Sequence, residues 1–157
     1  MKSLSAVLLA ALAVAGLVLA AGAQNNVKQG EDVATEVQSS PRLNDIMVQQ
    51  QMRHIKLWFA GDAGNWPLAD YELDQLKDGF DDVANLLGGE LAQQHVGGAI
   101  SGLEKAIDAK SREAFVSAFD RLSAGCNECH RTLDHAFIMI QRPALNPYSD
   151  QNFPPRQ

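Results

Sequence analysis

Two cysteines and a histidine lie within five residues of one another in the stretch SAGCNECHRTL: Cys126, Cys129 and His130. On a helix, side chains three and four positions apart point to the same side, so all three can reach one flat object. C-x-x-C-H is the attachment pattern of haem c, in which two thiols bind the porphyrin covalently and the imidazole binds the iron. The spacing therefore predicts one covalently attached haem, with His130 as the proximal iron ligand.

Three other chemistries use a close cysteine pair, and the rest of the sequence argues against each. A thioredoxin-like redox pair follows a strand in a βαβ unit, which this sequence does not predict. A zinc site needs four ligands, and the chain has no second C-x-x-C and no H-x-x-x-H. A disulfide between Cys126 and Cys129 would close only a four-residue loop and would constrain the unfolded chain little. Covalent haem is the favoured interpretation.

The amino terminus has the features of a secretory signal peptide. After Lys2 an apolar run extends from Leu4 to Ala20, and small residues at 21–23 precede Gln24. A membrane anchor is the alternative, but the Ala-rich run and its small-residue exit favour cleavage after Ala23. We therefore expect residues 1–23 to be removed, leaving no integral membrane span, and the mature protein to be exported to the periplasm. In that oxidising compartment two free thiols would be unstable, which again favours bonded cysteines.

The charge of the mature chain restricts its partners. Without Lys2, 12 basic side chains face 19 acidic ones, a net charge of −7. Nucleic acid and anionic lipid are therefore disfavoured, whereas a basic docking surface on a redox partner protein would be attracted. A purely solubilising role for the charge is the alternative. The sequence leaves open whether two copies pair as a homodimer.

Hydrophobic periodicity predicts an all-α protein with no strand. Residues 24–39 are polar and aperiodic and are expected to form a flexible leader. The apolar stripes that follow fit an antiparallel four-helix bundle over residues 40–142 that carries the covalent haem, with an extended C-terminal segment over 143–157. The predicted helices run from Pro41 to Gly61, from the cap Asn65 to Gly88, over the glycine-rich stretch 97–110, and from the cap Ser111 towards Gln141.

A helical bundle with AGCNECHRTL near the end of its last helix resembles the cytochrome c′ family. The resemblance covers roughly Pro41 to Gln141. Members of that family are exported four-helix bundles with one covalent haem, so the resemblance implies the same fold and cofactor here. This chain differs in continuing well beyond the haem histidine.

The second axial position of the iron separates two functions. Its occupant must approach the haem from the face opposite His130, which excludes His135 and Met139 because the predicted helix of His130 contains them. The resemblance implies that the distal residue comes from the first helix, where Met47 and His54 share the central stripe. Both stay open as distal ligands, with His54 preferred, and so does a vacant site that Leu57 or Trp58 merely covers.

A histidine or methionine at that position would favour electron transfer, because the iron is then saturated. The sequence therefore predicts a periplasmic mono-haem c-type cytochrome that carries one electron between redox partners and is not an enzyme. A vacant site would instead permit binding of nitric oxide or another small gas, as the family resemblance implies.

Overall fold

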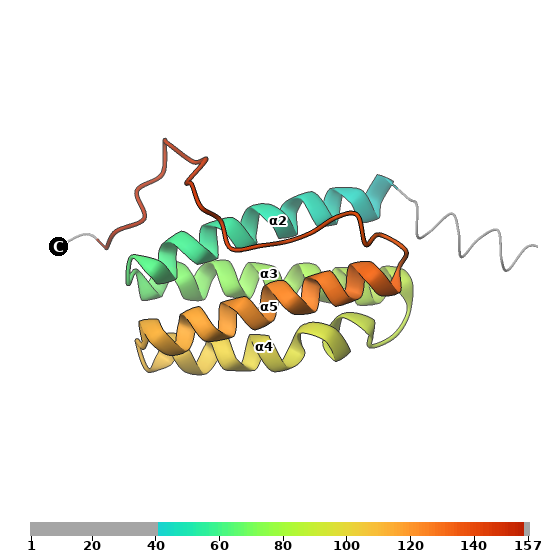
Figure 1. Cartoon of the computed structure of the whole chain (residues 1–157), viewed down its shortest axis with the longest axis horizontal. Helices are drawn as coiled ribbons and strands as arrows, with labels where there is room; N and C mark the ends of the chain where they lie inside the picture. The colour runs from blue at the N-terminus through green and yellow to red at the C-terminus, as the bar shows by residue number, and fades with distance from the viewer. Residues whose placement is uncertain (1–40, 156–157) are drawn as a thin grey trace, which may run out of the picture. The chain divides into compact units, whose positions relative to one another are not determined.

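The computed structural model describes residues 41–155, and in that range it contains four helices and no strand. The predicted signal peptide and leader lie outside the described residues. Consecutive helices run in opposite directions and pack side by side (Figure 1). The prediction of an all-α fold with four helices is thus confirmed for this part of the chain. The helices are α2 (Pro41–Asp62), α3 (Trp66–Leu87), α4 (Leu91–Asp108) and α5 (Arg112–Thr132).

Local signals account for the starts of two helices. The Asn65 side chain accepts a hydrogen bond from the Leu68 N–H, and the Ser111 hydroxyl accepts one from the Ala114 N–H. Each side-chain oxygen satisfies a backbone donor that the first helical turn leaves without a partner. Both predicted N-caps are therefore confirmed.

The third helix is longer than its glycine-rich sequence suggests. It begins at Leu91, and its buried residues include Val96 and Leu103, which pack into the core. Gly125 of α5 lies against the carbonyl of His95, so closely that a Cβ at Gly125 would collide with the carbonyl oxygen. Burial of an apolar face against a neighbouring helix thus outweighs the low helix propensity of glycine.

The last helix ends nine residues earlier than predicted, at Thr132 and not near Gln141. Asp134 has a φ of 59°, in the left-handed region that stops a right-handed helix. Aspartate adopts this conformation more readily than most residues. The chain therefore reverses directly after the C-x-x-C-H motif.

Beyond α5, the return segment (residues 133–155) runs back along the bundle (Figure 1). It is attached to α2 and α5 through hydrogen bonds, cation–π contacts and aromatic packing. Phe153 is 4% exposed and belongs to the core. The contacts of the segment's far part include Arg142 with Asp120 and Trp58, Tyr148 with Lys56, and Phe153 with Phe59 and with Asn65, the N-cap of α3.

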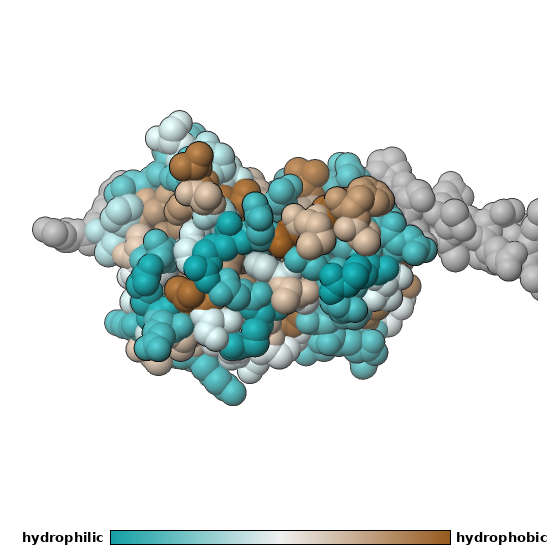
Figure 2. Space-filling model, viewed as in Figure 1, coloured by the Kyte–Doolittle hydropathy of each residue, from teal (hydrophilic) through white to brown (hydrophobic). Residues whose placement is uncertain are grey.

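The core fills the space between the helices. Its largest fully buried aromatic side chains, Phe115 and Phe119, come from α5, and Phe115 lies directly over Gly61 of α2. Figure 2, in the same view, shows a mostly polar surface with apolar atoms gathered where the return segment leaves α5. The exposed large apolar residues of that stretch are Phe137, Ile138 and Met139. No described helix has the length and hydropathy needed to cross a membrane.

Candidate functional site

A cavity of about 850 Å³, including its opening to solvent, lies at the end of the bundle that carries the C-x-x-C-H motif. Residues of all four helices and of the return segment line it. The five residues predicted from the sequence as haem-binding candidates are all among them: Met47, His54, Cys126, Cys129 and His130.

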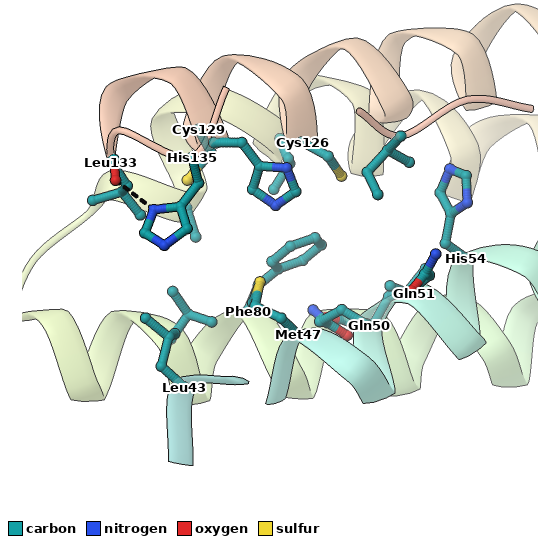
Figure 3. Close-up of a pocket in the computed structure, with 16 residues that line it drawn as sticks. Leu43, Met47, Gln50, Gln51, His54, Phe80, Cys126, Cys129, Leu133 and His135 are labelled. Atoms are coloured by element: carbon teal, nitrogen blue, oxygen red, sulfur yellow. Dashed lines mark hydrogen bonds between the residues drawn. The ribbon is translucent and has the colours of Figure 1, made fainter. Parts of the chain in front are cut away.

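The two cysteines enter the cavity from α5, as Figure 3 shows. Burial raises the pKa of Cys126 to about 12, with a further contribution from neighbouring Cys129. Burial likewise raises the pKa of Cys129. Both side chains are therefore protonated thiols at neutral pH, whereas a redox-active dithiol of the thioredoxin type depends on a lowered pKa.

The motif does not form a compact chelate. Between residues 41 and 155, no three His, Cys, Asp or Glu side chains are grouped closely enough to hold a bare metal ion. Cys126, Cys129 and His130 nevertheless face the same cavity. Ligands that share a cavity without converging on one point suit a wide, flat cofactor better than a single zinc ion.

His130 has a defined orientation. Its Nδ1 lies 3.0 Å from the carbonyl oxygen of Ile138. Because a carbonyl can only accept, this hydrogen bond requires the proton on Nδ1, and in the neutral ring Nε2 then keeps its lone pair. Metal-binding histidines are commonly held in this way by a backbone carbonyl. The imidazole is thus prepared to bind a metal through Nε2.

His54 is engaged elsewhere. Its Nε2 lies 2.8 Å from the Ser123 hydroxyl, which itself donates to the Phe119 carbonyl at 3.2 Å. The ring also packs on the Phe119 ring, with 4.4 Å between centroids. Burial lowers the pKa of His54 to about 4, so the imidazole is neutral at pH 7. In Figure 3 it lies at the far end of the cavity from Cys129.

Met47 lies about two turns nearer the start of α2 than His54. Its side chain is half-buried and points into the cavity from the side opposite the two cysteines (Figure 3). Phe80 of α3 enters from the same side. A thioether is only a weak hydrogen-bond acceptor and has three flexible bonds, so Met47 can reorient with little loss of polar interactions.

Sequence reasoning missed the residues that follow the motif. The exclusion of His135 and Met139 as ligands assumes that they continue the helix of His130, which is wrong: both lie beyond the end of α5, and His135 lines the cavity. Its Nδ1 lies 2.5 Å from the Leu133 carbonyl. Ile140 of the return segment also lines the cavity. Asp134, which tolerates a left-handed backbone, was the available signal for this reversal.

The chemistry of the donors fits a covalently held haem. Two thiols and one oriented imidazole enter a largely apolar cavity from α5, and a thioether enters from α2. No protein-family model, curated protein or solved structure matches this chain.

Proposed function

We propose that this chain is a mono-haem c-type cytochrome that carries one electron between redox partners. The observation that carries the proposal is that Cys126, Cys129 and His130 line one largely apolar cavity with His130 Nε2 left free to bind a metal. The likeness to the cytochrome c′ family and the predicted signal peptide support export to the periplasm as part of this proposal.

Bound haem would supply an iron that alternates between the ferric and ferrous states. The chain's own residues would do the rest. Cys126 and Cys129 would tether the porphyrin through thioether bonds, and His130 would bind the iron from the α5 side. The apolar lining of the cavity would exclude water and lower the local dielectric. No substrate turnover is part of the proposal.

We propose Met47, in preference to His54, as the distal ligand. His54 would have to give up its hydrogen bond to buried Ser123, which would cost about 1–3 kcal/mol for the groups left unpaired. Met47 already points into the cavity from the face opposite the cysteines and has no such bond to break. Methionine and histidine together would saturate the iron and favour electron transfer over gas binding.

The first experiment is expression in a host that has cytochrome-maturation machinery. We expect the mature protein to retain haem on a denaturing gel, and the double variant Cys126→Ala, Cys129→Ala to lose it. A colourless wild-type protein whose mass lacks a porphyrin would contradict the proposal outright.

The distal ligand is tested by a matched pair of variants on α2. Met47→Ala should convert a low-spin absorption spectrum into a high-spin one that changes with carbon monoxide, while His54→Ala should leave it low-spin. The reverse pattern would identify His54 as the ligand. A wild-type protein that is high-spin and binds carbon monoxide or nitric oxide would instead identify a gas-binding protein with a vacant distal site.

A further inference from the structure

The two variable positions of the C-x-x-C-H motif have different surroundings. Glu128 is exposed, and its carboxylate pairs with Arg131 on the same helix. Asn127 turns its amide towards the return segment instead. Its Nδ2 donates to the Ile140 carbonyl at 2.8 Å, and its Oδ1 accepts from the Ile140 N–H at 2.7 Å. One side chain thereby satisfies both backbone groups of Ile140, much as a paired strand would.

The same stretch of chain also holds His130. Ile138, whose carbonyl accepts from His130 Nδ1, lies two residues before Ile140. Residues 138–143 contain no helix, turn or bend. In an extended chain, backbone groups two residues apart face the same side. The pairing of Asn127 with Ile140 therefore sets the register in which the Ile138 carbonyl meets His130, and a slip of one residue would turn that carbonyl away.

We propose that Asn127 is a positioning residue: by binding both backbone groups of Ile140, it holds the Ile138 carbonyl against His130 and so keeps the His130 Nε2 lone pair available to the cavity. The geometry stands by itself, but its role in metal binding rests on the proposed haem function. Asn127 occupies a variable position of the motif, so the motif alone does not predict this role.

The hydrogen bond has an electronic consequence as well as a steric one. Donation of the Nδ1 proton to a carbonyl makes the imidazole a stronger base and a stronger electron donor to a metal. A stronger donor favours the ferric state. Loss of the Asn127 contacts should therefore weaken this effect and make the iron easier to reduce.

The first test needs no cofactor and uses the full mature chain without haem. Asn127→Ala is compared with Asn65→Ala, which removes the N-cap of α3 and a hydrogen bond to the far end of the return segment, at Phe153. Ring ¹⁵N NMR should show His130 protonated at Nδ1 in the wild type and in Asn65→Ala. In Asn127→Ala both tautomers should appear, and the Ile140 amide should exchange at least ~10-fold faster because the free energy of local opening falls.

The second test uses the haem-loaded protein. At a fixed ambient potential, the ratio of oxidised to reduced protein should fall up to ~10-fold in Asn127→Ala, which corresponds to about 59 mV for one electron. In Asn65→Ala the ratio should stay within about twofold of the wild type, since both hydrogen bonds that it loses are remote from His130 and the Ile138 carbonyl is kept. Covalent haem should be retained in both variants.

The two proposals fail in different ways. If His130 keeps its Nδ1 tautomer in Asn127→Ala and the haem-loaded variant keeps the wild-type reduction potential, the positioning role is overturned. A tautomer shift in Asn127→Ala, together with a wild type that never binds haem, supports that role and overturns the proposed function. If Asn127→Ala does not fold, Ile140→Pro, which lacks the backbone N–H, is compared with Ile140→Val, which keeps it. If the two Ile140 variants have the same His130 tautomer populations, the positioning role is overturned.

Discussion

Burial of His54 predicts that the protein loses stability as the pH falls from about 6.5 to about 4. The pKa of His54 is lowered from 6.5 to about 4 because its side chain is removed from solvent. Each pKa unit corresponds to about 1.4 kcal/mol, so the full shift is worth about 3 kcal/mol. That is a large part of the ~5–15 kcal/mol that stabilises a typical domain.

The sign follows from proton binding in the two states. Between pH 6.5 and pH 4 the unfolded chain binds a proton at His54 and the native chain does not, so the free energy of unfolding falls as the pH falls. Above pH 6.5 the residue is neutral in both states and contributes no slope. Below pH 4 both states bind the proton, and the loss is complete.

Urea denaturation followed by far-UV circular dichroism would measure this effect at pH 7, 6, 5 and 4. Carboxylates also titrate near the acid end, so the useful quantity is the difference between the wild type and His54→Leu. In that variant Ser123 still donates to the Phe119 carbonyl. We expect the wild type to lose about 3 kcal/mol more than His54→Leu between pH 7 and pH 4.

Parallel pH profiles for the two proteins would refute the reasoning. They would mean that His54 titrates near its ordinary pKa, and therefore that it is hydrated or charged in the native protein. The close pairing with Ser123 could not then be its main state in solution.

Further substitutions probe the packing of the bundle and a buried ion pair. Gly125→Ala should destabilise the protein by about 2 kcal/mol, because the new methyl group would collide with the α4 backbone. Gly98→Ala, whose methyl group would face open space, should stabilise it by about 0.5–1 kcal/mol. The midpoints of thermal unfolding of the two variants should therefore shift in opposite directions. Phe153→Ala should lower the free energy of unfolding, measured by urea denaturation, by about 3 kcal/mol, and it should make the return segment more sensitive to limited proteolysis. Arg53→Met should lower the free energy of unfolding by about 3 kcal/mol, because it leaves the Glu72 carboxylate, which is 2% exposed, without its cation. In a double-mutant cycle, adding Glu72→Gln should recover part of this loss.

The helices were predictable where short-range signals define them. Asn65 and Ser111 cap helices whose apolar residues recur at helical spacing, and both starts were found. The end of α5 was not predictable from the same signals. Apolar residues continue past Thr132, and the next strong stop is Pro143. The early end depends on a left-handed Asp134 and on bonds to residues several positions further on, which periodicity does not report.

The sequence identifies the C-x-x-C-H motif of the candidate site, but it does not decide which residue lies on the opposite side of the cavity. C-x-x-C-H has a spacing that specifies its own geometry, so Cys126, Cys129 and His130 could be identified without a structure. Met47 and His54 share one helical stripe, and only the position of Ser123 on another helix distinguishes them. A partner 69 residues away in the sequence leaves no local signature.

The return segment also bears on the order of events during biosynthesis. It is translated after the cysteines, and it supplies a wall of the cavity as well as the carbonyl that orients His130. In the finished fold the thiols are shielded and protonated. On the proposed function, cofactor loading would therefore precede the closing of this wall over the cavity. A chain cut short just after His130 would keep the whole attachment motif but leave that side of the cofactor open to water.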